Sequence, residues 1–203
     1  IYFKQDIPIH FKNKKIFPIS PLPVKNITNR IKQDKKIYPF SFVGHYQKSH
    51  TRDDRFELIE LISKHFPTSK LIYSHDREHQ INDKDLKKIL VSTKINLSPS
   101  GRIWDSYRHT ELVNYGSPIL LPKNDSKICG EEWIDLHDCI IYETKFFEGK
   151  WKIINTDELI KKLNYVLNDD NLQKSIYDNY RKKVIKEHTQ KVRSEYILSI
   201  MRK

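Results

Sequence analysis

The chain has 203 residues, with 37 Lys and Arg against 26 Asp and Glu, and its formal net charge is +11 at pH 7. That length allows one large domain or two small ones with a substantial core, and the charge favours anionic partners such as nucleotides, nucleic acids or membrane surfaces. The sequence has no apolar run long enough to cross a bilayer and no signal-peptide pattern, so a soluble protein is expected.

The first 36 residues predict a connector. Residues 1–24 end in Phe-Pro-Ile-Ser-Pro-Leu-Pro-Val, whose three prolines forbid a regular helix and favour an extended path. Residues 25–36 are polar and basic, which predicts a surface loop. Because the first residue is Ile1 and not Met, the chain is expected to be a fragment or a processed product.

The next part of the chain predicts two strands, each followed by a helix. The strand Ile37–Gly44 ends in a glycine, which suits a tight turn or a close ligand approach, and the basic loop His45–Arg52 follows it. The first helix, from Asp53 to about His65, has apolar residues at helical spacing and aspartates at its favourable end. The second strand, Lys70–Ser74, precedes an amphipathic helix over Asp83–Ser92.

The loop after the second strand contains four residues of types that bind metals: His75, Asp76, Glu78 and His79. They lack any helical or turn spacing known to hold zinc, so a metal site is the less favoured alternative there. Cys129 and Cys139 are the only cysteines, and their separation is not a metal-ligand spacing either. We therefore expect no metal site and a reduced, cytoplasmic setting.

The centre of the sequence predicts a strand, loop, helix, turn and strand in succession. Ile95–Leu97 is strand-like, Ser98–Arg102 is a loop with turn residues, and Asp105–Tyr115 is a helix. Gly116-Ser117-Pro118 stops that helix before the buried strand Ile119–Leu121.

The start of the helix at Asp105 predicts an anion site. Asp105 or Ser106 can cap the helix, and Arg108 and Glu111 are three residues apart on one face near its positive end. A guanidinium suits phosphate, and a carboxylate suits a pair of sugar hydroxyls. The alternative is a solvated surface ion pair, which is the commoner role of an Arg and a Glu at this spacing.

The rest of the chain predicts one more strand, Cys139–Tyr142, a short apolar run at Trp151–Ile154, and a helix capped by Thr156. Helix formers then continue from Asp169 to the end, interrupted near His188. Alternating strands and helices imply an α/β fold, a Rossmann-like parallel sheet with helices on both faces and a helical carboxyl-terminal end. Ligands bind such sheets at the carboxyl ends of the strands.

Three motifs together resemble the donor-binding motif of GT-B-type glycosyltransferases, closest to the exostosin-like and spore-coat CgeB-like groups. They are Ser-Pro-Ser-Gly at 98–101, Ser-x-Arg-x-x-Glu at 106–111 and Gly-x-Pro-Ile-Leu at 116–120. The resemblance extends from about Ile37 to the end. It implies a nucleotide-sugar donor-binding domain over 37–203, joined by the connector 1–36 to an amino-terminal domain that this chain lacks.

The resemblance also implies roles for particular residues. Arg108 would neutralise the diphosphate, Glu111 would accept hydrogen bonds from ribose hydroxyls, and Gly116 would let the chain turn tightly. The Phe-Val-Gly at 42–44 resembles the first strand-to-helix corner of these enzymes, where a basic side chain approaches the diphosphate. The expected donor-site residues are Gly44, His45, Arg52, Arg55, Ser100, Gly101, Arg102, Ser106, Tyr107, Arg108 and Glu111.

The implied reaction is metal-independent transfer of a hexosyl or related group from a nucleotide-diphosphate sugar to a glycan or glycoconjugate acceptor. No convincing Asp-x-Asp motif is present, and the sequence also lacks the glycine-rich dinucleotide, P-loop, serine-hydrolase and zinc-protease motifs. Arg, Lys and a helix terminus would then stabilise the leaving diphosphate. In GT-B enzymes the general base usually comes from the amino-terminal domain, so we assign none within this chain. His45 and His109 are candidates for contacts near the sugar, and packing or surface roles are equally open for both.

Two other functions remain alternatives. The net charge, with aromatic residues such as Tyr46 and Tyr107 near basic ones, is compatible with a nucleic-acid or polyanion-binding module, although no recognition motif supports it. The spread of the lysines among many Ile and Asn residues is also what an AT-rich genome encodes. A non-catalytic glycosyltransferase-like domain is the third reading, and the basic carboxyl-terminal helices leave a peripheral membrane contact open.

Overall fold

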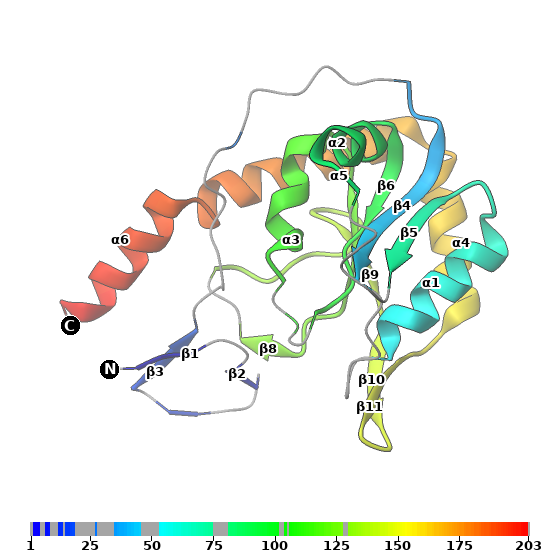
Figure 1. Cartoon of the computed structure of the whole chain (residues 1–203). Helices are drawn as coiled ribbons and strands as arrows, with labels where there is room; N and C mark the ends of the chain where they lie inside the picture. The colour runs from blue at the N-terminus through cyan, green and yellow to red at the C-terminus, as the bar shows by residue number, and fades with distance from the viewer. Residues whose placement is uncertain are drawn as a thin grey trace.

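The computed structural model describes residues 2–4, 7–8, 12–13, 15–18, 27, 35–45, 53–74, 81–101, 104, 106–127 and 130–202. A five-stranded sheet in the order β5-β4-β6-β7-β9 lies at the centre of the molecule, and all its neighbouring strands are parallel (Figure 1). The strands are β4 (Tyr38–His45), β5 (Lys70–Ser74), β6 (Thr93–Leu97), β7 (Ile119–Pro122) and β9 (Ile140–Tyr142). Each lies where the sequence predicts a strand.

The strand order reverses between β4 and β6. The chain enters the sheet at β4, adds β5 on one side, with Phe42 opposite Leu71, and then adds β6 on the other, with Phe40 opposite Ile95. In doubly wound sheets, ligands bind outside the carboxyl ends of the strands at such a reversal. The topology therefore directs attention to the ends of β4 and β6.

Helices cover both faces of the sheet (Figure 1). One core cluster packs α1 and α4 against the face that includes Phe40 and Leu120, and the other packs α2 and α5 against the face that includes Ile119 and Leu121. The helices are α1 (Asp54–His65), α2 (Asp83–Val91), α3 (Arg108–Glu111) with the 3-10 turn η2 (Leu112–Tyr115), α4 (Thr156–Leu167), α5 (Asp170–Glu187) and α6 (Gln190–Met201). Because a strand alternates its side chains, the consecutive apolar residues of β7 fill both clusters. The predicted α/β, Rossmann-like fold is confirmed.

Helix ends follow the expected chemistry in some places and depart from it in others. Asn82 caps α2, since its side chain accepts a hydrogen bond from the Asp85 backbone N–H at 2.9 Å. The expected cap at Thr156 is wrong: Thr156 is the first helical residue, and Asn155 occupies the cap position with a left-handed φ of 57° and no side-chain cap bond. The predicted interruption near His188 is confirmed, because α5 ends there and Thr189 caps α6. Within the described ranges, no helix is long and apolar enough to cross a membrane.

The described parts of the first 36 residues contain short paired strands. β1 (Tyr2–Lys4) pairs in parallel with β3 (Ile16–Pro18), and β2 (Ile7–Pro8) pairs antiparallel with β8 (Ser126–Lys127). The predicted extended path agrees with these strands. The β2–β8 pair attaches the segment to the domain, and Ile7 is only 1% exposed.

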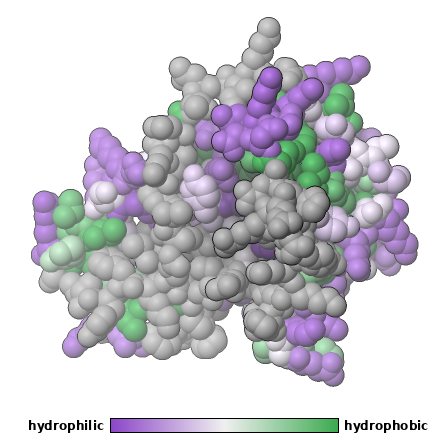
Figure 2. Space-filling model, viewed as in Figure 1, coloured by the Kyte–Doolittle hydropathy of each residue, from purple (hydrophilic) through white to green (hydrophobic). Residues whose placement is uncertain are grey.

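A β-hairpin follows β9, and the sequence predicts only half of it. β10 (Thr144–Phe147) and β11 (Lys150–Ile153) pair antiparallel, whereas the sequence indicates a single apolar run at Trp151–Ile154. In Figure 1 the hairpin extends beyond the sheet at its lower end, and the same end of Figure 2 shows pale green beside purple. β10 was missed because its sequence, Thr-Lys-Phe-Phe, does not alternate between apolar and polar residues as a half-buried strand does. In the structure Lys145 to Phe147 are all exposed.

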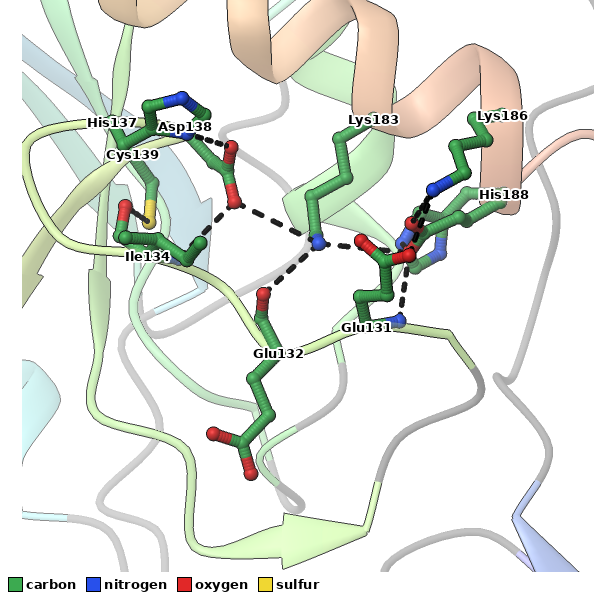
Figure 3. Close-up of polar contacts among 10 residues, drawn as sticks. Glu131, Glu132, Ile134, His137, Asp138, Cys139, Lys183, Lys186 and His188 are labelled. Carbon is green, nitrogen blue, oxygen red and sulfur yellow. Dashed lines mark hydrogen bonds and ion pairs between the residues drawn. The ribbon is translucent and has the colours of Figure 1, made fainter.

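A buried ionic cluster fastens the segment before β9 to α5. Lys183 projects from α5 and donates to the Glu132 carbonyl oxygen at 2.9 Å, as Figure 3 shows. Its ammonium lies 3.7 Å from Asp138 and 3.6 Å from Glu187, and 5.5 Å from the centre of the Trp133 ring. All these side chains except Glu132 are buried. The Lys183 ammonium therefore compensates the two carboxylates at a place that solvent does not reach.

Candidate functional site

The candidate site lies at the carboxyl ends of β4 and β6, where the loop after β6 and the short helix α3 approach α1. The loop is fastened at its start, because the Ser98 backbone N–H donates to the Leu120 carbonyl oxygen at 2.8 Å. The Ser98 hydroxyl also lies 2.7 Å from His109 Nδ1. These contacts join two strands and α3 at one corner of the sheet.

His109 connects α3 to this loop. Its Nε2 lies 2.7 Å from the Trp104 carbonyl oxygen, which can only accept, so Nε2 carries the proton. The Ser98 hydroxyl lies on the opposite side of the ring, at Nδ1. His109 is 1% exposed and its ring lies 5.1 Å from that of Trp104, so it packs inside the fold and is not a surface residue, while a contact with the sugar stays a prediction.

Arg108 crosses from α3 to the end of β4. Its guanidinium donates to the Val43 carbonyl oxygen and lies 5.9 Å from the centre of the Phe42 ring. Burial lowers the pKa of Arg108, and the nearby charge of Glu111 partly opposes that shift. A guanidinium has five N–H donors, so one that is desolvated and fixed on the backbone by a single donor can still bind an anion.

Arg55, in the first turn of α1, also approaches the Phe42 ring. It donates to the Ser100 carbonyl oxygen from Nη2 at 2.6 Å and from Nε at 3.1 Å, and lies 6.0 Å from the Phe42 centre. Burial lowers the pKa of Arg55, the Tyr142 and Asp54 side chains raise it, and the charge of Arg108 lowers it further. The two arginines therefore form one region of concentrated positive charge.

The two expected glycines have different surroundings. Gly44 does not end its strand, which continues to His45. A side-chain carbon at Gly44 would come 2.8 Å from the Phe42 ring, so glycine is needed there for that ring and not for a turn. At Gly101 the nearest atom to such a carbon is an Arg55 nitrogen at 3.8 Å, an ordinary contact distance.

Ser100 has an unsatisfied hydroxyl. The side chain is fully buried, and its Oγ has no hydrogen-bond partner among the described residues. Unpaired buried hydroxyls are uncommon and costly, and one explanation for them is a role in binding. The Ser100 hydroxyl belongs to the same residue whose carbonyl oxygen accepts hydrogen bonds from Arg55.

The helix expected over Asp105–Tyr115 is shorter than predicted. α3 has four residues, from Arg108 to Glu111, and a 3-10 turn follows it. Tyr107 occupies the cap position without a side-chain cap, while the Ser106 hydroxyl accepts from the Arg108 backbone N–H at 3.4 Å. One helical turn has only a small dipole, so the positive field expected from a helix start comes here from the arginines. Gly116 ends the unit as predicted, with a left-handed φ of 75°.

Glu111 and Arg108 do not form an ion pair with each other in the described part of the chain, since Arg108 reaches across to β4. Glu111 still acts on its surroundings. Burial and the Glu111 carboxylate both raise the pKa of Tyr107, and the same two causes raise that of Tyr115. The surface-pair alternative is therefore wrong for Arg108, because its guanidinium donates to the Val43 carbonyl oxygen and forms no ion pair with Glu111.

Several expected residues lie outside the described part of the chain: Arg52, Arg102 and Asp105, with the loop at 75–80. His45 is placed at the end of β4 by its backbone alone. Among the residues that are described, no three His, Cys, Asp or Glu side chains form a group that could hold a metal. Metal-independent chemistry stays a prediction.

Sequence reasoning missed two aromatic residues that shape the site. Phe42 lies beneath both arginines, and Trp104 is fully buried with its indole N–H donating to the Pro122 carbonyl oxygen at 3.0 Å. Phe42 carried a usable signal, since Phe40 and Phe42 alternate along a strand towards one face. Trp104 carried none, because it stands in a loop.

No family model matches the sequence, and no curated protein matches it either. Solved structures do match. TarM superposes with a TM-score of 0.59 at 16% identity, over 93% of this chain and 39% of TarM. A point mutant of S. aureus TarM in complex with fondaparinux, alpha-GlcNAc-glycerol and UDP gives 0.59 at 18%, over 93% and 40%.

A third match, the C-terminal domain of the glycosyl transferase group 1 family protein LpcC from Francisella tularensis, has a TM-score of 0.50 at 14% identity, over 83% of this chain and 96% of that domain. At these identities the likeness shows the fold, that of the C-terminal domain of a GT-B glycosyltransferase. This chain spans about two fifths of the length of TarM. The exostosin-like or CgeB-like grouping stays a prediction.

Proposed function

We propose that this chain is the donor-binding part of a glycosyltransferase and that it binds a nucleoside-diphosphate sugar at the carboxyl ends of β4 and β6. The observation that carries the proposal is the pair of half-buried guanidiniums, Arg55 and Arg108, which lie 6.0 and 5.9 Å from the centre of the Phe42 ring at the point where the strand order reverses. Two cations held close together at one ring favour a ligand with two negative charges. A diphosphate meets that requirement.

Each neighbouring group then has a role. The diphosphate would accept hydrogen bonds from the guanidiniums of Arg108 and Arg55, and the Ser100 hydroxyl, which has no partner among the described residues, would donate to it as well. Glu111, partly exposed and acceptor-only when ionised, would receive the two ribose hydroxyls. We extend the proposal to the sugar, which would lie beyond the end of β4 near His45.

In the reaction, an acceptor hydroxyl oxygen attacks the anomeric carbon, and the bond from that carbon to the diphosphate oxygen breaks. The leaving diphosphate gains negative charge, which the two arginines would offset, so metal-independent transfer is part of the proposal. The acceptor proton passes to a general base. We propose that this base, like most of the acceptor site, belongs to a part of the protein outside this chain.

The test is calorimetric titration and thermal unfolding of the chain with UDP, GDP, dTDP and ADP, their sugar conjugates, and a single-stranded oligonucleotide. At a ligand concentration about 100 times Kd, a ligand that binds only the folded state stabilises it by about 2.7 kcal/mol. For a domain of this size that is a rise in Tm of roughly 5–10 °C. One nucleotide should be preferred over the others.

Variants locate the site. Glu111→Ala should weaken nucleotide binding by about 10- to 100-fold, because it removes charged hydrogen bonds to the ribose. Glu60→Ala, an exposed glutamate on α1, is the matched control and should bind normally. Unchanged affinity in Glu111→Ala would contradict the site. Binding of the oligonucleotide alone, fading with salt, would instead support the polyanion alternative, and nucleotide binding without transfer in the full-length protein would support a non-catalytic domain.

A further inference from the structure

The β10–β11 hairpin continues directly from β9 at the carboxyl edge of the sheet, the edge that carries the candidate donor site (Figure 1). In its register, Lys145 lies opposite Lys152, Phe146 opposite Trp151 and Phe147 opposite Lys150. The proposed donor site uses none of these side chains.

The hairpin contacts the α1 region both at its base, through Ile153, and next to its turn, through Lys150. Ile153 is buried, and its backbone N–H donates to the Glu57 carboxylate at 2.7 Å. Lys150 forms an ion pair with Asp53 at 2.8 Å, just before α1. The turn is two residues long, with left-handed φ values of 48° at Glu148 and 80° at Gly149, which is the tight turn that suits the twist of a hairpin. The tip is therefore held in a defined direction.

Large aromatic side chains are exposed near this tip. Phe146 is 52% exposed and Phe147 is 54% exposed, and the Phe146 ring lies 5.5 Å from that of Trp151. Consecutive strand residues point to opposite faces, so Phe146 and Phe147 place one aromatic ring on each face of the tip, and the lysines share the face of Phe147. An exposed apolar group at a projecting end commonly marks an interaction site.

The lysines of the hairpin add a second feature. Lys145 and Lys152 are directly opposite each other across the two strands, an arrangement of like charges that destabilises an isolated sheet. Neither forms an ion pair with a carboxylate in the described part of the chain. An anionic surface next to the hairpin would attract both lysines and screen the repulsion between them.

We propose that the tip of the β10–β11 hairpin binds the surface of an anionic lipid bilayer. The phenylalanines and Trp151 lie at the level of the headgroups, where aromatic rings are favoured, so that the exposed Glu148 carboxylate of the turn stays hydrated, and Lys145 and Lys152 contact the lipid phosphates. Entry of a tip brings both of its faces into contact at once. A nucleic-acid strand would stack along one face, so apolar rings on both faces favour the bilayer.

The position of the hairpin has a consequence for the rest of the molecule. Asp53, which holds Lys150, is two residues before Arg55 of the candidate donor site. A hairpin anchored in lipid would thus keep the carboxyl edge of the sheet close to the membrane surface.

The test is sedimentation of the chain with vesicles of phosphatidylcholine alone and of phosphatidylcholine with phosphatidylglycerol. Binding should require the anionic lipid. Phe146→Ala with Phe147→Ala should weaken it by about tenfold or more, from the loss of apolar burial. Each of Lys145→Gln and Lys152→Gln should weaken it by about fivefold at low salt. All changes are at exposed or half-exposed positions, and equal unfolding midpoints will show that each variant is folded.

Matched controls separate the hairpin from the general positive charge. Lys161→Gln with Lys174→Gln removes the same two charges from α4 and α5, and Tyr165→Ala removes an aromatic group that is 59% exposed on α4. These variants should bind as the wild type does. Brominated lipids should quench a fluorescence component that is lost in Trp151→Phe, since Trp104 and Trp133 are buried.

Three outcomes would overturn the proposal. They are no binding to anionic vesicles, equal losses in the hairpin and control variants, or binding without quenching of Trp151, which would mean adsorption by net charge alone. Hairpin variants that weaken oligonucleotide binding and leave vesicle binding intact would point to nucleic acid instead. Nucleotide affinity of the same variants, measured without vesicles, should be unchanged, so this test is independent of the proposed donor site.

Discussion

Replacing Lys183 by methionine should destabilise the protein far more than removing the charge of an exposed lysine. The Lys183 side chain is 6% exposed, and its ammonium compensates two carboxylates, Asp138 and Glu187, that are 7% and 8% exposed. Methionine keeps the volume of the stem but leaves both carboxylates without this cation. Removing one member of a buried ionic group costs about 3–5 kcal/mol.

The expected loss lies near the lower end of that range, because both carboxylates keep other donors. Asp138 accepts from the Ile134 backbone N–H at 3.1 Å, and Glu187 accepts from the Glu131 backbone N–H at 3.0 Å. A loss of about 3 kcal/mol is a large part of the 5–15 kcal/mol typical of a folded domain. It corresponds to a fall in Tm of roughly 6–12 °C.

The assay is equilibrium unfolding in urea followed by circular dichroism, with Lys186→Met as the control. Lys186 is on the same helix and pairs with Glu131 at 2.7 Å and with Glu187 at 3.7 Å, but its side chain is 64% exposed, so solvent replaces most of what these pairs contribute. Its midpoint should stay close to that of the wild type. If both variants unfolded at the same urea concentration with equal slopes, the buried cluster would not stabilise this fold and the reasoning would be refuted.

Two further predictions concern buried titrating groups. Burial, followed by the charges of Arg193, Lys183 and His109, lowers the pKa of His188 well below 6.5, so below that pH the unfolded chain binds a proton that the folded chain excludes. The free energy of unfolding should therefore fall as pH drops below 6.5, by up to about 1.4 kcal/mol per pH unit from this residue. Urea unfolding at pH 7 and 5.5 should show a smaller fall for His188→Gln than for the wild type. Equal falls in the two proteins would contradict this prediction. Burial also raises the pKa of the Cys139 thiol well above its ordinary value, with the charges of Asp138 and Asp135 adding to the effect. In a Cys129→Ser background, Cys139 should react with a thiol reagent at pH 8 only as fast as the structure opens, and labelling at the rate of a denatured control would show an accessible thiolate.

The main elements of the sheet and its helices were predictable, because their signals are local. Alternating or continuous apolar residues mark β4, β7 and β9, helical spacing marks α1 and α2, and Gly116 marks the end of the central helical unit. Alternation of these elements along the chain was enough to predict a doubly wound parallel sheet. The motif also marked Arg108 as a candidate donor contact, which stays a prediction.

The surroundings of Arg108 were not predictable in the same way. Its guanidinium contacts the Val43 carbonyl, 65 positions earlier in the chain, and Arg55 contacts Ser100 over 45 positions. Such contacts depend on the order of strands in the sheet, which no local pattern contains. The short α3 is held in the same way, by contacts of His109 with Ser98 and of Trp104 with Pro122 that join distant parts of the chain.

The sequence by itself determined the class of fold, the places of its main strands and helices, and a set of candidate residues, because these depend on periodicity, turn chemistry and motif spacing. The tertiary structure alone decided that Arg55 and Arg108 share the Phe42 ring and that Lys183 is buried among carboxylates. It also revealed that Phe146 and Phe147 stand exposed on a rigid hairpin. These features arise from packing between segments far apart in the chain, where burial and the loss of solvent, and not the residue types alone, set the strength of each charge and contact.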